Sequence, residues 1–395
     1  MTSKSHPYQR WACAAVAVAT IAWTAVIPTT ANANTTAPTT SQRASIPATA
    51  WTHEQVDFVL SRQLASGAIL STGTRISPYF ANVGASGLIA ANTPASRAGA
   101  LKWMKWYLGH LNVAATNVPT NSVFDYVYDP VTQTETPTGD FDSVDSYAST
   151  ALNLAYEAYS SGDVKLRGFV RRNLGTYQAI AKILTEGAPT GVRIQAGSPD
   201  AALTIAKPSY PIAYTMDNVE VYSGLADFAR LETLLGRRAA AAHYSSWAGI
   251  TKDAILAKLW NPTNENWDWA FANSSNTSVF YPQATVQLWP IIYGVVNPTD
   301  PKAISSWAQF SASYPKWYAG ETPDSYPWVS MARAAQVMGE TTHATDYLTN
   351  VHSRYAPEFT QPSSCGNAIC GDWYDDEAGW FMLVTASLDR HHAGG

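Results

Sequence analysis

The chain has 395 residues, of which 46% are hydrophobic and 14% charged, and 30 acidic against 25 basic side chains give a net charge of −5. An acidic chain without clusters of basic residues argues against a nucleic acid as the partner. This length suffices for one large domain or for two.

The first residues carry the pattern of a secretory signal. Lys4 and Arg10 precede an apolar run over residues 11–27, and a small-residue A-x-A site follows the run. This order predicts a signal peptide over residues 1–33. Residues 34–50 are rich in Thr, Ala, Ser and Pro without periodicity, which predicts a flexible leader. No later apolar run is long enough to span a bilayer, so we expect a secreted, extracellular protein without stable membrane insertion.

Helical periodicity dominates the remainder, and the predicted helices come in pairs. In chain order the pairs are 53–66 with 78–91, 94–113 with 143–160, 164–185 with 217–235, 237–260 with 279–295, 301–314 with 323–338, and 342–355 with 375–388. The first helix of each pair is the more polar, which predicts an outer helix around a buried inner one. Six such pairs close into a toroid, so residues 51–395 are predicted as one all-α (α/α)6 domain. A small β-hairpin is expected inside residues 117–136.

The predicted connections are long before each inner helix and short after it. Long loops on one rim of a rigid scaffold usually carry function, and acids and aromatic residues collect on this rim. The candidate catalytic residues are Asp142, Asp145, Asp217, Glu220, Asp375 and Asp376. The candidate substrate-binding residues are Trp267, Asp268, Trp269, Tyr281, Gln283, Asp324, Trp328 and Trp373.

The acids at the helix starts have a second interpretation. Asp217 and Glu220 open a helix that is apolar on almost every side, and acids one turn apart at its N-terminus indicate a pocket. The same spacing is that of a capping box. Asp142 precedes its helix and suits a cap, while Asp145 lies in a first turn where the helix dipole favours an acid. For each tryptophan the alternative is packing in the core.

Carbohydrate chemistry suits this set of side chains. Trp and Tyr offer flat apolar faces with a polar tip to the C–H faces of sugars. Glycosidic cleavage needs one carboxylic acid to protonate the leaving oxygen and one carboxylate to activate water or to attack. No histidine falls in a predicted loop entering an inner helix, which argues against a Ser/His/Asp triad, a zinc site and a His-based lyase. No metal or cofactor is expected.

Two motifs carry a family resemblance. DFDSVDSYAST (140–150) and MDNVEVYSGL (216–225) are similar to inner-helix starts in the unsaturated glucuronyl and rhamnogalacturonyl hydrolases. WYDDEAGWFML (373–383) resembles the paired-Asp motif of bacterial α-1,6-mannanases. Together with the six hairpins, they give residues 51–390 a resemblance to the six-hairpin glycosidase superfamily, without assigning one family.

The resemblance implies an (α/α)6 barrel and roles for particular acids. By position, it points to Asp145 and Asp217 in catalysis and substrate binding, and to Asp375 and Asp376 as a catalytic pair. The leading hypothesis is a secreted glycoside hydrolase acting on a polysaccharide or oligosaccharide. The alternatives are a polysaccharide lyase on the same fold, and a carbohydrate-binding or envelope-associated protein without activity. The lyase would use a tyrosine base such as Tyr147, Tyr222 or Tyr281.

Two cysteines remain after the predicted signal peptide. Cys365 and Cys370 are five positions apart in the stretch CGNAIC. In an oxidising compartment this spacing predicts a local disulfide. The sequence does not indicate an oligomeric state.

Overall fold

The computed structural model describes residues 46–359 and 371–393, which belong to one compact unit. The predicted signal peptide, most of the predicted leader, and both Cys365 and Cys370 lie outside these residues. Residues 48–50 are already helical, so the folded unit begins before the predicted boundary at residue 51. No helix of the described residues combines the length and the apolar character that crossing a bilayer requires.

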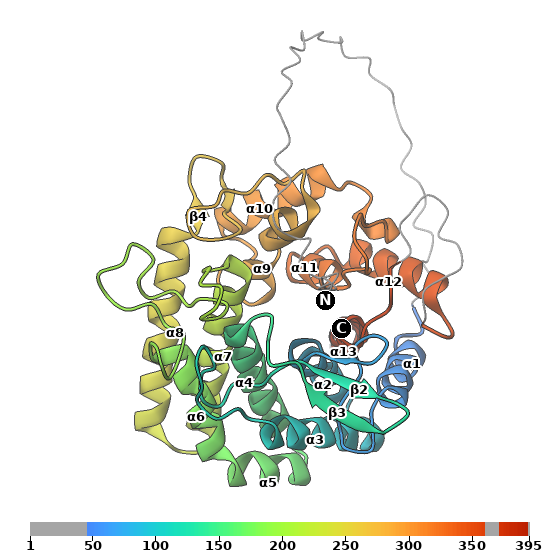
Figure 1. Ribbon diagram of the computed structural model, residues 1–395. Helices are drawn as coiled ribbons and strands as arrows, with labels where there is room; N and C mark the ends of the chain where they lie inside the picture. The colour runs from blue at the N-terminus through green and yellow to red at the C-terminus, as the bar shows by residue number, and fades with distance from the viewer. Residues whose placement is uncertain (1–45, 360–370, 394–395) are drawn as a thin grey trace, which may run out of the picture. The chain divides into compact units, whose positions relative to one another are not determined.

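Figure 1 shows an inner set of helices surrounded by an outer set. The α-helices of the described residues are α1 (Ala48–Ser61), α2 (Pro78–Ala91), α3 (Pro94–Gly109), α4 (Val144–Ser160), α5 (Val164–Arg172), α6 (Leu174–Thr185), α7 (Thr215–Leu234), α8 (Arg238–Lys258), α9 (Trp289–Ile292), α10 (Pro301–Ser313), α11 (Ser330–Val337), α12 (Thr341–Tyr355) and α13 (Asp375–Ala393). Helices α2, α4, α7, α9, α11 and α13 contact one another in that order, and α13 contacts α2. This closed ring confirms the predicted (α/α)6 toroid.

Glycines allow two pairs of inner helices to approach closely. A Cβ atom on Gly87 of α2 would lie 2.6 Å from Cα of Gly379 in α13. A Cβ atom on Gly224 of α7 would lie 2.6 Å from the carbonyl oxygen of Ser149 in α4. Because backbone meets backbone at both places, the N-terminal ends of these four helices are held in fixed relative positions.

The fourth inner helix is broken, although the hydrophobic pattern predicts one helix over residues 279–295. A π-helical turn, η2 (Phe280–Ala284), and a 3-10 turn, η3 (Thr285–Gln287), precede the single turn of α9. Pro282 and Pro290 cannot donate the amide hydrogens that a continuous helix needs. A residue before a proline also avoids the helical region, and Tyr281 is extended, with φ −110° and ψ 134°.

The fifth inner helix starts later than predicted. The pattern predicts a helix from residue 323, but α11 begins seven residues further on. Pro327 interrupts the helical pattern, and Trp328 has a left-handed φ of 61°. The turned backbone directs the amides of Trp328 and Val329 to the carboxylate of Glu377, at 3.0 and 2.6 Å. Glu377 therefore stabilises the start of α11.

The third outer helix is also divided, into α5 and α6.

The predicted loop asymmetry is present in the structure. The connections before the inner helices span 62–77, 110–143, 186–214, 259–279, 314–329 and 356–374, the last only partly described. Those after the inner helices run from two residues (92–93) to eight (293–300). A short 3-10 turn, η4 (Trp317–Ala319), lies in one of the long connections. All the inner helices thus present their N-terminal ends to the rim with the long loops.

The predicted β-hairpin is confirmed. Strands β2 (Tyr126–Asp129) and β3 (Thr134–Pro137) pair antiparallel, and β1 (Arg75–Ile76) adds a third strand beside β2. A second small pair, β4 (Trp260–Asn261) and β5 (Asn266–Trp267), was not predicted. The three-stranded sheet joins the first and second long loops.

Candidate active site

The starts of α4 and α7 bring two of the predicted acids together through one serine. The Oγ atom of Ser143 lies 2.6 Å from Oδ1 of Asp145 and 2.6 Å from Oδ2 of Asp217. A serine hydroxyl has one hydrogen to donate, so it can serve only one of these oxygens. The second contact becomes a hydrogen bond only when the other aspartate carries a proton. The two aspartates therefore form a pair that holds a proton through Ser143.

The surroundings decide which aspartate holds this proton. Asp145 is fully buried and has two further donors, the amide of Ser146 at 3.0 Å and the hydroxyl of Thr204 at 2.7 Å. Burial raises the pKa of Asp145, and these donors together with Ser143 lower it. The result is a pKa of about 6.

Asp217 is half-buried, and Ser143 is its hydrogen-bond partner among the described residues. Burial, and then the charges of Asp145 and Glu220, raise the pKa of Asp217 well above the usual range. Asp217 is thus the member of the pair better suited to hold the proton, which would lie on the oxygen of Ser143.

Thr204 reaches this pair because α7 holds its loop. The side chain of Asn218 accepts from the amide of Thr204 at 2.8 Å and donates to its carbonyl oxygen at 3.1 Å. Neither α4 nor α7 has a side-chain cap hydrogen bond at its N-terminus. The capping-box interpretation of Asp217 and Glu220 therefore does not hold, whereas Asp145 does accept from one amide of its own first turn.

Glu220 lies one turn beyond Asp217 and connects three inner helices. Its Oε1 atom accepts from the hydroxyl of Tyr79 in α2 at 2.6 Å and from the indole of Trp289 in α9 at 2.8 Å. Burial raises the pKa of Glu220 to about 7. Tyr79 and Trp289 are missing from the predicted site, although Tyr79 is the second residue of its helix, as Asp145 is of α4.

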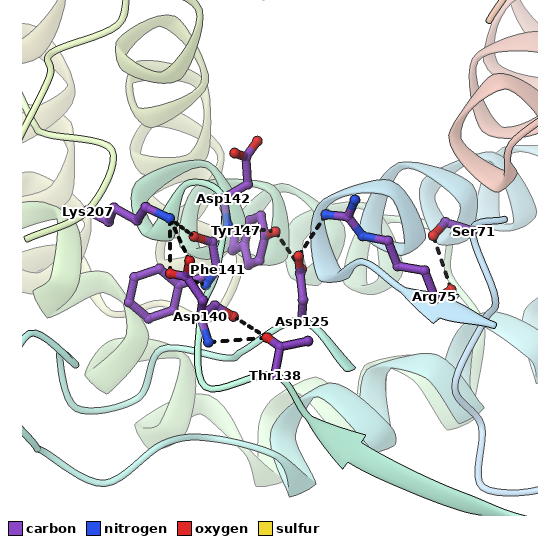
Figure 2. Close-up of polar contacts among 9 residues, drawn as sticks. All are labelled: Ser71, Arg75, Asp125, Thr138, Asp140, Phe141, Asp142, Tyr147 and Lys207. Atoms are coloured by element: carbon purple, nitrogen blue, oxygen red, sulfur yellow. Dashed lines mark hydrogen bonds and ion pairs between the residues drawn. The ribbon is translucent and has the colours of Figure 1, made fainter. Parts of the chain in front are cut away.

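Asp142 combines a fixed backbone with a free carboxylate. Its amide donates to the hydroxyl oxygen of Tyr147 at 3.2 Å. Lys207 donates to the neighbouring carbonyl of Phe141 at 2.7 Å and to Asp140 at 2.9 Å. In Figure 2 the carboxylate of Asp142 points away from this network. The side chain is exposed, and its charge contributes to the raised pKa of Asp217.

Tyr147 ties this loop to the three-stranded sheet and is unsuited to act as a base. Its hydroxyl donates to Asp125 at 2.7 Å, and Arg75 donates to the same carboxylate at 2.7 Å (Figure 2). Burial and then Asp125 raise the pKa of Tyr147 well above the usual value. Burial and nearby carboxylates likewise raise the pKa of Tyr281 well above the usual value. A general base needs a pKa near the working pH. Tyr222 lies further along α7, with its hydroxyl 3.4 Å from a backbone carbonyl.

The acids that open α13 point in different directions, as predicted for adjacent helical residues. Asp375 is fully buried, its oxygens lack a well-formed hydrogen bond, and burial followed by the charge of Asp376 raises its pKa well above the usual range. The charge of Arg62 lowers it. Asp376 instead contributes to the raised pKa of Tyr79 and of Tyr326. Its own pKa is raised to about 7 by burial. Asp376 therefore lies on the side of Tyr79 and Tyr326, and Asp375 on the side of Arg62 in the first long loop.

Three of the four predicted tryptophan platforms are buried. Trp267 has no exposed surface and packs edge-on against Trp260. Trp373 is 3% exposed and donates its indole hydrogen to Gln55. For these two, the interpretation as sugar platforms is corrected to core packing. Trp328 is also buried, and only Trp269 keeps a half-buried ring, beside Tyr214.

The predicted polar residues of this rim hold its loops. Asp268 accepts from the side-chain amide of Asn261 at 3.0 Å, and Gln283 accepts from a backbone amide at 2.6 Å. Asp324 accepts from the indole of Trp328 at 2.8 Å and from the amide of Ser325 at 2.6 Å. These hydrogen bonds position the loops from which a ligand-binding surface is built.

An aromatic wall, formed by Phe80, Tyr374, Tyr326, Trp328 and Tyr281, joins four hairpins at this rim. Ring centroids lie 5.6 Å apart for Phe80 and Tyr374, 5.0 Å for Tyr326 and Trp328, and 5.4 Å for Tyr281 and Trp328. Tyr281 is 41% exposed, so part of the wall is open to a ligand. Sequence reasoning missed Phe80 and Tyr374, although both lie near the starts of predicted inner helices.

No protein-family model matches the chain, and no curated protein sequence matches it significantly. Solved structures do match it. A wild-type glycosidase has a TM-score of 0.58 at 11% identity, covering 87% of this chain and 96% of that one. A glycoside hydrolase family 76 mannosidase from Bacteroides thetaiotaomicron has a TM-score of 0.54 at 9% identity, covering 87% and 99%. A GH63 mannosylglycerate hydrolase from Thermus thermophilus has a TM-score of 0.56 at 11% identity, covering 85% and 100%.

At these identities the similarity concerns the fold. It confirms the predicted (α/α)6 barrel.

Proposed function

We propose that this protein is a secreted glycoside hydrolase that cleaves a polysaccharide or oligosaccharide. Asp217 is the general acid, and Asp142 is the carboxylate that activates water or attacks the sugar. The observation that carries this assignment is the contact of Ser143 with two aspartates at once, which keeps a proton on Asp217. The glycosidases that share the fold support the reaction class, and the N-terminal pattern supports secretion.

The two proposed residues have opposite environments, as this chemistry requires. Asp217 is a carboxylic acid at neutral pH and can protonate the leaving oxygen. Asp142 is exposed, and water solvates its negative charge. Neighbouring carboxyl groups that differ in this way suit the acid and the carboxylate of a glycosidase.

Ser143 also serves the step after proton transfer. When Asp217 gives its proton to the leaving oxygen, it becomes negatively charged. The hydroxyl of Ser143 then rotates from Asp145 to Asp217 and donates to the new charge. Asp145 keeps its hydrogen bonds from Ser146 and Thr204. The pair can therefore change its charge without moving its backbone.

The test begins with a panel of plant and microbial polysaccharides and the mature protein. New reducing ends without unsaturated ends show hydrolysis, whereas ultraviolet-absorbing unsaturated ends show a lyase. Asp217→Asn and Asp142→Asn should each lower kcat by about 100-fold or more, the usual contribution of a general acid or base. Asp253→Asn, a change at an exposed acid of the outer helix α8, is the control and should keep its activity.

Leaving groups separate the two roles. An aryl glycoside with an acidic phenol needs little protonation, so Asp217→Asn should cleave it nearly as fast as the parent does. Asp142→Asn should stay impaired on the same compound. Near-full activity of both variants on the polysaccharide would refute the assignment. A protein that binds the glycan equally well in all variants, with no turnover by the parent, would be a binding protein instead.

A further inference from the structure

The ionisable side chains that line the candidate site are predominantly carboxyl groups. Its acids come from the second, third, fifth and sixth hairpins and are Asp142, Asp217, Glu220, Asp324 and Asp376. They act on shared neighbours. The charges of Asp142, Asp217 and Asp324 contribute to the raised pKa of Tyr281, and those of Asp324 and Asp376 to that of Tyr326. Two of the acids also contact the aromatic wall or a ring packed on it. Asp324 accepts from the indole of Trp328 at 2.8 Å, and Glu220 accepts from the indole of Trp289, whose ring centroid lies 5.8 Å from that of Trp328.

The cations that flank the site are held by other groups. Arg75 pairs with Asp125, and Lys207 pairs with Asp140. Arg193 is buried and donates to backbone carbonyls, as at 2.7 Å to Leu184. The leading influences on the pKa of the acids facing the site are burial, hydrogen bonds and other carboxylates.

Arg62, on the side of Asp375, donates to a backbone carbonyl at 2.7 Å. Binding an acidic sugar normally takes a guanidinium or ammonium group aimed at its carboxylate. The cations named here are committed to protein partners instead.

The aromatic wall also disfavours an anionic sugar, for a reason that does not depend on the acids. The face of an aromatic ring is negative, so it attracts C–H groups and cations and repels anions. Tyr281 is 41% exposed, and the charges of Asp142 and Asp217 contribute to its raised pKa. A sugar lying on this wall would place its substituents among the acids.

We infer that the site takes glycans built of neutral or amino sugars and rejects glycans that carry uronate, sulfate or phosphate groups. This inference rests on the proposed function, because it concerns the same site. It also distinguishes between the two motif resemblances. The similarity to glucuronyl hydrolases implies an acidic sugar, whereas the charges of the site agree with the mannanase resemblance. Like charges brought together at an interface cost several kcal/mol, so discrimination on the order of 100-fold is expected.

Carboxyl reduction provides matched probes for this inference. It converts a uronate into the corresponding neutral sugar without changing the linkage or the ring stereochemistry. Hexasaccharides of galacturonate, mannuronate and glucuronate, and their carboxyl-reduced counterparts, would be titrated calorimetrically into the mature protein. New reducing ends would be followed on the same samples. Mannose and glucosamine hexasaccharides complete the set.

The expected result is that a reduced, neutral or amino-sugar hexasaccharide binds at least about 30-fold more tightly than any uronate one. Raising the salt from about 20 mM to about 500 mM should narrow that gap, because ions screen the repulsion. A uronate hexasaccharide bound or cleaved as well as its reduced counterpart would overturn the inference.

Turnover separates this inference from the proposed function. Cleavage without charge preference would leave the hydrolase and refute the inference. Charge-selective binding without cleavage of any probe would support the inference and refute the hydrolase.

Discussion

Removing the hydroxyl of Ser143 tests the proton-sharing pair directly. In Ser143→Ala, Asp145 keeps two donors, and Asp217 loses its hydrogen-bond partner among the described residues. The loss should depend on pH, because a hydrogen bond to a charged group contributes more than one to a neutral group.

The sign follows from the pKa of Asp145. Burial raises that pKa to about 6 in the folded protein, above the ordinary value of 3.8. At about pH 4 Asp145 is protonated in the fold, and the substitution should lower the free energy of unfolding by about 1 kcal/mol. At about pH 8 Asp145 is ionised in the fold, and the cost should rise to about 2–3 kcal/mol. The pKa of Asp145 should accordingly move upward in the variant.

Urea unfolding followed by tryptophan fluorescence at both pH values measures these costs. Ser149→Ala is the control, since Ser149 is buried in the same helix but donates only to a backbone carbonyl of its own helix. Its cost should be the same at both pH values. If the cost of Ser143→Ala also does not change with pH, Ser143 does not donate to an ionised aspartate, and the assignment of the proton to Asp217 fails.

Three further predictions concern Glu157, the glycine contact of α2 with α13, and Lys207. Burial raises the pKa of Glu157 from 4.5 to about 7, so the protonated carboxyl favours folding at low pH and this contribution is lost as the pH rises through about 7. Glu157→Gln should therefore stabilise the fold by up to about 3 kcal/mol at about pH 8 and hardly at about pH 4, and equal free energies of unfolding for variant and parent at about pH 8 would contradict the raised pKa of Glu157. Gly87→Ala forces a Cβ atom into the backbone of α13 and should cost more than about 2 kcal/mol in urea unfolding, while Gly249→Ala, with nothing within 4 Å of its new methyl, should stabilise α8 by up to about 1 kcal/mol. Lys207→Met releases the backbone next to Asp142, so kcat should fall by about tenfold with KM nearly unchanged, and a loss confined to KM would count against a positioning role.

The hairpin architecture was predictable because its determinants are local. Residues 78–91 are a helix in both the prediction and the structure, since Pro78 suits a first helical position and apolar residues follow at helical spacing. The breaks in the fourth and fifth inner helices were missed because hydrophobic periodicity continues through Pro282 and Pro327. In each case the missing backbone donor outweighed the pattern.

The candidate site was predictable in part. Acids at the starts of inner helices identified the rim and Asp217, Glu220 and Asp142 on it. The roles of Trp267 and Trp373 were wrong, because an indole has the same sequence signal in a core as on a sugar-binding surface. Tyr79 and Trp289 were missed because nothing local marks a tyrosine or an indole that will contact a glutamate on another helix.

Helical periodicity and turn residues act over a few positions, so they were enough to predict the six hairpins and the rim to which the inner helices point. The contact of Ser143 with both Asp145 and Asp217 depends instead on packing between helices. Ser143 meets Asp217 because α4 and α7 pack closely at Gly224, and Asp145 is enclosed because α7 holds Thr204 over it. Such contacts join residues about 60 to 75 positions apart, and burial and neighbouring charge, which set the pKa, come into being only when the chain has folded.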